Sequence, residues 1–120
     1  MRHFNKGNKD EFICNCGCGK GIEYMDEDFL WKLDIARGLA RVPFKLNSAF
    51  RCLEHNRTVS TDTSSHPKGC AADIECIKSY NRYRIIYGLT KAGISRIGIR
   101  GDFIHSDADP DKPKELTWVY

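Results

Sequence analysis

The spacing of apolar residues changes along this chain, and the change restricts the fold more than any other feature. Residues 27–40 place apolar side chains at helical spacing behind an acidic start, and a second helical pattern runs from Ser79 to about Gly93. Its side chains on one face are Tyr83, Ile86, Tyr87 and Thr90. Stretches typical of strands are 44–48, 71–76, 94–99, 103–106 and 116–120. Because short turns join the late strands, we expect an α+β fold with helices packed on one face of a small antiparallel sheet.

The 120 residues are enough for one domain, and no repeat or linker interrupts them. Residues 1–120 are therefore expected to form a single domain. Residues 54–69 are polar and rich in Ser and Thr, which predicts a long loop. Residues 12–21 contain three glycines among alternating cysteines, which predicts a tight loop.

Charge and hydropathy argue against several classes of protein. The net charge of +3 is spread over mixed acids and bases, whereas nucleic-acid binding concentrates Lys and Arg on one face. No apolar run follows the first basic residues, so we predict no secretory signal peptide and no membrane span. We therefore expect a monomer that is made in the cytoplasm and reaches an outer target only when another machinery releases it.

A carboxylate stands inside one of the apolar strand patterns. Asp73 lies between Ala72 and Ile74, and a buried charge is costly unless it is paired or bound to a metal. Six residues separate it from His66, and Gly69 permits a sharp turn between them. Such a turn can bring an imidazole nitrogen and a carboxylate oxygen to one cation. A hydrogen-bonded structural pair explains His66 and Asp73 equally well when they are taken alone.

A second histidine completes a possible metal site. His105 lies between Ile104 and Ser106 in another apolar strand. Two imidazoles and one carboxylate are typical of catalytic zinc, which keeps its fourth position for water. Bound zinc lowers the pKa of that water to about 7. We therefore expect His66, Asp73 and His105 to bind Zn²⁺.

Two acids near His105 are candidates for the general base. Asp107 follows it by two residues and would point to the same side of a regular strand. Asp102 precedes it by three residues and would point to the opposite side, unless the turn at Gly101 brings it over the metal. Spacing alone favours Asp107. A turn acid, or a hydrogen-bond partner of His105, explains either residue as well as a base does.

An arginine after the first predicted strand is a candidate for binding the substrate. Arg51 belongs to no obvious run of charges. Near a metal, its guanidinium could bind a carboxylate through two hydrogen bonds or stabilise an oxyanion. A surface salt bridge is the alternative interpretation of this residue.

These segments together resemble the zinc D-alanyl-D-alanine peptidase family, which shares its fold with the hedgehog signalling domain. The similarity rests on the pattern Ser-x-His-x-x-Gly-x-Ala-x-Asp at residues 64–73 and on Phe-Ile-His-x-Asp at residues 103–107. The sequence Ser-Ala-Phe-Arg-Cys at 48–52, the opening residues 12–19 and Trp118 are also similar to family members. The segment Ser-Thr-Asp-Thr at 60–63 departs from relatives, which commonly carry glycines there.

The resemblance implies a hedgehog/DD-peptidase-like fold and a zinc ion on the two histidines and the aspartate named above. It implies that Arg51 binds a substrate carboxylate or an oxyanion, beside Ser64. It places a catalytic acid at Asp102, slightly ahead of Asp107, although small relatives keep the His-x-Asp pair. The implied activity is D,D-carboxypeptidase or endopeptidase cleavage of peptidoglycan stem peptides. Small size and the N-terminal sequence favour a phage endolysin or a virion-associated wall enzyme.

Other interpretations of the chain remain open. The six cysteines are Cys14, Cys16, Cys18, Cys52, Cys70 and Cys76. Their Cys-x-Cys-x-Cys opening differs from the usual zinc knuckle, so structural or disulfide-linked cysteines compete with a second metal site. The protein could also be a non-catalytic zinc-fold module for wall binding or phage structure, or a purely structural zinc scaffold.

Overall fold

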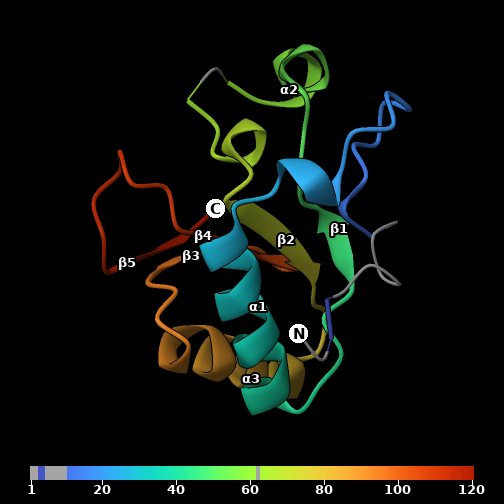
Figure 1. Cartoon of the computed structure of the whole chain (residues 1–120). Helices are drawn as coiled ribbons and strands as arrows, with labels where there is room; N and C mark the ends of the chain where they lie inside the picture. The colour runs from blue at the N-terminus through green and yellow to red at the C-terminus, as the bar shows by residue number, and fades with distance from the viewer. Residues whose placement is uncertain (1–2, 5–10, 62) are drawn as a thin grey trace.

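Three α-helices and five β-strands make up the part of the chain described by a computed structural model, residues 3–4, 11–61 and 63–120 (Figure 1). The helices are α1 (Glu27–Ala40), α2 (Leu53–Val59) and α3 (Ser79–Lys91). The strands are β1 (Leu46–Ser48), β2 (Ala71–Glu75), β3 (Arg96–Ile99), β4 (Phe103–Asp107) and β5 (Leu116–Val119). Two single turns of 3₁₀ helix are η2 (Ile22–Tyr24) and η3 (His66–Lys68). The fold is α+β, as the apolar spacing predicts.

The five strands form one mixed sheet in the order β1-β2-β4-β3-β5. The first three pairs of neighbours are antiparallel, but β5 runs parallel to β3. The prediction of a wholly antiparallel sheet is therefore wrong for β5. Both edges of β4 are already paired, so the chain returning from β4 pairs instead with the outer edge of β3. Because β3 and the returning strand both run opposite to β4, they are parallel to each other.

Two helices cover one face of this sheet and supply much of its core. Helices α1 and α3 pack against each other (Figure 1). Their apolar side chains share one buried cluster with the sheet. The sheet contributes Ile74, Ile97 and Ile104 to that cluster. Side chains alternate along a strand, so their immediate neighbours point to the opposite face. The predicted packing of helices on one face holds for α1 and α3.

The segment predicted as a long loop contains α2 and η3. Helix α2 has only seven residues, and its apolar residues lie at its two ends, so its sequence has no apolar face that would predict a helix. Both end residues, Leu53 and Val59, are exposed. Local hydrogen bonds form it instead. Cys52 caps its start by accepting a hydrogen bond from the backbone of His55, and Asn56 is buried and donates to the carbonyl of Thr61.

Most of the apolar pattern identified in the second helix lies on its outer side, whereas Ile86 packs partly against the core. Tyr83 and Tyr87 are exposed, whereas Ile85 and Leu89 are buried against the rest of the core. Both patterns have helical spacing, so the sequence predicts the helix itself but not which face packs inward. Aromatic rings with a polar hydroxyl are tolerated at the surface, which makes the aliphatic pair the better core residues.

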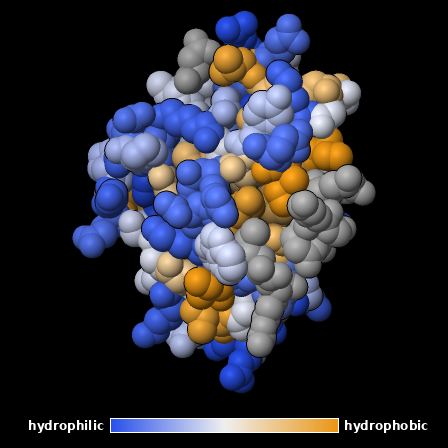
Figure 2. Space-filling view, viewed as in Figure 1, coloured by the Kyte–Doolittle hydropathy of each residue, from blue (hydrophilic) through white to orange (hydrophobic). Residues whose placement is uncertain are grey.

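The surface is largely hydrophilic on the face shown in Figure 2, where apolar side chains form separate patches. Ile35 and Leu39 of α1 are among the exposed apolar side chains of the protein. Within residues 3–4, 11–61 and 63–120, no helix has the length and hydropathy required to cross a bilayer.

Candidate metal centre

One row of paired residues crosses the sheet on the face opposite α1 and α3. The register pairs Ser48 with Asp73, Asp73 with His105, His105 with Gly98, and Gly98 with Trp118. Residues directly opposite each other on neighbouring strands share a face. The register therefore places a carboxylate beside an imidazole, and His105 Nδ1 lies 2.8 Å from Asp73 Oδ1. Sequence spacing alone could not supply this contact, because it depends on which strands pair.

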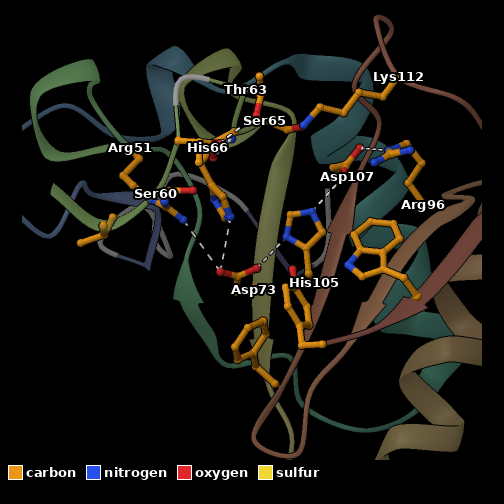
Figure 3. Close-up of a pocket in the computed structure, with 16 residues that line it drawn as sticks. Arg51, Ser60, Thr63, Ser65, His66, Asp73, Arg96, His105, Asp107 and Lys112 are labelled. Atoms are coloured by element: carbon orange, nitrogen blue, oxygen red, sulfur yellow. Dashed lines mark hydrogen bonds and ion pairs between the residues drawn. The ribbon is translucent and has the colours of Figure 1, made fainter. Parts of the chain in front are cut away.

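The second histidine reaches this row from a loop. His66 begins η3, and its side chain points at Asp73, with His66 Nε2 lying 3.3 Å from Asp73 Oδ2 (Figure 3). One donor atom from each of His66, Asp73 and His105 lies within 4.8 Å of the other two. The structure thus brings together the three residues that the sequence predicts as metal ligands.

Hydrogen bonds outside the cluster fix which imidazole nitrogen can bind a cation. His66 Nδ1 lies 2.7 Å from the carbonyl oxygen of Ala49, which can only accept, so Nδ1 carries the proton and donates it. The lone pair of His66 Nε2 then faces Asp73. His105 Nε2 lies 2.7 Å from Asp107 Oδ2, and its Nδ1 faces Asp73. Donation from each outer nitrogen to a carbonyl or carboxylate is the arrangement usual for metal-binding histidines.

The charges in this cluster fit a cation. A lone pair of His66 Nε2 aimed at the Asp73 carboxylate is repulsive unless a proton or a metal ion lies between them. His105 has a carboxylate at each ring nitrogen, so a neutral ring leaves one of those contacts repulsive as well. Two histidines and a carboxylate are a donor set for zinc, and the open side of the cluster faces a pocket of about 320 Å³.

The pKa values of Asp73 and His105 likewise indicate that the site favours positive charge. Burial alone would raise the pKa of Asp73, but its contacts with His105 and His66 outweigh burial and hold the pKa well below its ordinary value. Burial alone would lower the pKa of His105, but the hydrogen bonds to Asp107 and Asp73 raise it. In the absence of metal, the site therefore favours a negative Asp73 and a protonated His105.

Asp107 lies behind His105, with both of its oxygens occupied. Its side chain is 1% exposed, and Oδ1 accepts from Arg96 Nε at 2.8 Å and from the backbone of Asp109 at 3.1 Å. Oδ2 faces His105 Nε2. Burial raises the pKa of Asp107, but the hydrogen bond from His105 and the other contacts outweigh it, so the pKa lies below the ordinary value. The geometry suits a residue that orients His105.

Arg51 reaches the pocket from the segment between β1 and α2. Its side chain is buried, Nη1 donates to Asn56 Oδ1 at 3.1 Å, and Nη2 donates to Ser48 Oγ at 3.4 Å. Nη2 also lies 4.0 Å from Asp73 Oδ2 (Figure 3). Burial lowers the pKa of Arg51, opposed by the nearby Asp73 charge. An arginine stays charged under such conditions. The hydrogen bonds to Asn56 and Ser48 therefore hold a positive charge beside the candidate metal site.

The remaining two predicted site residues lie in different places. Ser64 lines the pocket, and its Oγ accepts a hydrogen bond from the backbone of His66 at 3.4 Å. Asp102 does not line the pocket: its side chain is 67% exposed and pairs with Arg100. Asp102 lies in the turn before β4, and this turn leaves its carboxylate outside the pocket that His105 lines. This exposed position outside the pocket agrees with the spacing argument, which disfavours Asp102.

Several residues that line the pocket are not predicted from the sequence as site residues. Arg96 and Tyr120 line the pocket, and the Arg96 guanidinium lies over the ring of Trp118 at 5.0 Å. Burial raises the pKa of Tyr120, which keeps its hydroxyl protonated. The sequence could have identified Arg96, because it is a charged residue at the start of an apolar strand pattern, just as Asp73 is a charged residue within one. Nothing comparable in the sequence marks Tyr120.

Comparison with models of protein families shows a similarity over most of the chain. The model of the family described as Peptidase M15 matches residues 5–107, which is most of the chain. The match includes all three candidate metal ligands and Arg51. A comparison with curated proteins gave no match.

Proposed function

The chain belongs to the Peptidase M15 family of metallopeptidases, and we propose that it hydrolyses D-Ala-containing peptide bonds in peptidoglycan stem peptides. The observation that carries this proposal is the cluster of His66, Asp73 and His105, which opens into a pocket beside a buried arginine. A purely structural zinc site is closed by four protein ligands, whereas this cluster offers three.

The residues around the cluster suggest how a substrate would be held. Zinc bound by the three residues would polarise the scissile carbonyl and lower the pKa of a water molecule. Arg51 keeps one guanidinium edge on Asn56 and Ser48, which fixes the direction of the group. Its positive charge beside the pocket suits the free carboxylate of a peptide C-terminus or a developing oxyanion.

We propose Asp107 as a positioning residue rather than as the general base. Its two oxygens already accept three hydrogen bonds, and its pKa is lowered, so it has little capacity to take another proton. By accepting from His105 Nε2, it keeps the proton on that nitrogen and leaves Nδ1 free for metal. Ser64 is a proposed substrate contact, because it lines the pocket next to His66.

Purified zinc-loaded protein tests the proposal directly. We would incubate it with a stem pentapeptide that ends in D-Ala-D-Ala, and separately with cross-linked stem dimers, and follow the products by mass spectrometry. Release of D-Ala identifies a carboxypeptidase, and loss of dimers identifies an endopeptidase. His66→Ala and Asp73→Ala should abolish either reaction. A folded protein that holds zinc but cleaves neither substrate would instead indicate a non-catalytic wall-binding module.

We also propose that the protein is a phage endolysin or a virion-associated enzyme, and that its target is the wall of the bacterium that the phage attacks. The support is that peptidoglycan stem peptides, the proposed substrate, are components of the bacterial wall. Addition of the protein to intact cells and to isolated walls, with release of wall fragments as the readout, tests this. Cleavage of soluble stem peptides without any release from isolated walls would contradict it.

A further inference from the structure

Four cysteines meet at a place separate from the candidate metal centre. Cys14, Cys16 and Cys18 come from the loop before η2, and Cys52 precedes α2. The sulfur atoms of Cys14, Cys16 and Cys52 lie 3.5 to 3.7 Å from one another. All four sulfurs lie within 4.8 Å of each other. The six cysteines are free thiols, so no disulfide explains the cluster.

These separations match the geometry of a tetrahedral thiolate site. Zinc binds cysteine sulfur at about 2.3 Å, so two sulfurs on one tetrahedral zinc lie about 3.8 Å apart. The three distances above fall just short of that value. A set of four thiolates is characteristic of zinc or of iron–sulfur centres, and four protein ligands leave no position for a substrate.

The loop backbone is shaped to bring the sulfurs together. In an extended strand, cysteines at alternate positions would point to one side but spread over about 7 Å per pair. Here the backbone of Cys14 donates to the carbonyl of Lys20 at 2.8 Å, which closes the loop on itself. Gly17 and Gly19 adopt φ values of 85° and 81°, which turn the chain back where other residues would be strained.

Backbone donors support negative sulfur atoms at the site. The backbone of Cys52 donates to Cys14 Sγ at 3.3 Å, and the backbone of His55 donates to Cys52 Sγ at 3.4 Å. Metal-bound cysteines are thiolates, and hydrogen bonds to a charged acceptor are stronger than those to a neutral one. The two contacts would therefore gain strength when the sulfurs bind a metal.

We propose that Cys14, Cys16, Cys18 and Cys52 form a second, structural zinc site. It ties the N-terminal loop to the segment that carries Arg51, which is adjacent to Cys52 in the chain. The same loop buries Phe12 in the core. Zinc bound here would stabilise that loop and fix the backbone from which Arg51 reaches its pocket.

Metal counting on protein prepared under reducing conditions tests the proposal. Wild-type protein should hold two zinc ions per chain, and His66→Ala with His105→Ala should hold one. Cys16→Ser with Cys18→Ser should also hold one, whereas Cys76→Ala should keep two. Cys76 is the matched control, because it is a buried cysteine outside the cluster.

X-ray absorption at the zinc edge identifies the ligands without relying on the cysteine variants to fold. The histidine double variant should show four sulfur neighbours at about 2.3 Å around its single zinc, and wild-type protein should average two sulfurs per zinc. If the wild-type spectrum shows only nitrogen and oxygen neighbours, or if mass spectrometry shows a disulfide within the cluster, the proposal is wrong. Neither result touches the proposed peptidase activity, which depends on the other site.

Discussion

Replacement of Asp107 by Asn tests how the structure prepares His105 for metal. All three groups that contact the Asp107 carboxylate are donors: the ring of His105, the Arg96 guanidinium and the backbone of Asp109. An asparagine has one oxygen to accept and one amide group that donates. The oxygen is expected to stay with charged Arg96, so the amide would face His105 Nε2.

That arrangement reverses the tautomer of the histidine. Facing a donor, Nε2 of His105 becomes the acceptor, and the proton moves to Nδ1, the nitrogen directed at Asp73. A protonated nitrogen cannot bind metal. Loss of such an outer hydrogen bond typically weakens metal affinity or activity by about 10- to 100-fold. The expected loss is therefore about 1.4 to 2.8 kcal/mol, at about 1.4 kcal/mol per factor of ten.

Zinc affinity, measured by competition with a chromophoric chelator, separates this role from that of a base. A positioning residue predicts weaker zinc binding by Asp107→Asn, with part of the activity restored at high zinc. A general base predicts unchanged zinc affinity and a fall in kcat that zinc does not restore. Asp102→Asn is the control, because its exposed side chain pairs with exposed Arg100 outside the pocket, and zinc affinity should change less than about twofold. Unchanged zinc affinity in Asp107→Asn would refute the reasoning given above.

Three further predictions concern pH, the arginine and a glycine in the sheet. Without metal, the raised pKa of His105 stabilises the fold below about pH 6.5, and this stability is lost as pH rises through that pKa. The lowered pKa of Asp73 stabilises the fold above about pH 4, and this stability is lost in acid. Thermal unfolding of zinc-free protein should therefore show highest stability between these values, and the gain in Tm on adding zinc should grow as pH rises to neutrality. Arg51→Lys should lower kcat/KM for a substrate with a free C-terminus by about 10- to 100-fold, since a lysine lacks the planar pair of donors. Gly98→Ala should destabilise the fold by about 1 to 3 kcal/mol in denaturant titration, because a Cβ there would lie 2.7 Å from the ring of Trp118.

Each of these predictions has an internal check. Gly101→Ala is the control for the glycine, because a Cβ at Gly101 meets no atom within 4 Å, and its stability should be unchanged. A Gly98→Ala protein as stable as wild type would mean that the Trp118 ring moves aside at no cost. If Arg51→Lys acts equally on substrates with and without a free C-terminal carboxylate, Arg51 does not bind that carboxylate. A zinc-induced gain in Tm that does not vary with pH would contradict the pH prediction.

The sequence was sufficient for the elements whose signal is local. The helix at 27–40 coincides with α1 because an acidic N-terminal turn and apolar spacing both mark it, and Asp26 caps it by accepting from the backbone of Phe29. The segments carrying β2, β3 and β4 were likewise visible from their runs of apolar residues. Asp73 and His105 stood out for the same reason, as polar residues in apolar strands, where burial requires a partner.

Tertiary structure decided everything that depends on strands and loops meeting. Pairing of β2 with β4 sets Asp73 opposite His105, and no spacing in the chain encodes that register. In the same fold Asp107 contacts His105 and Asp102 lies in an exposed turn, which separates two acids that spacing and the family resemblance ranked in opposite order. Residue types show that a charge needs a partner, but only the folded chain supplies it, because the partner comes from a segment 32 residues away in the case of Asp73 and His105.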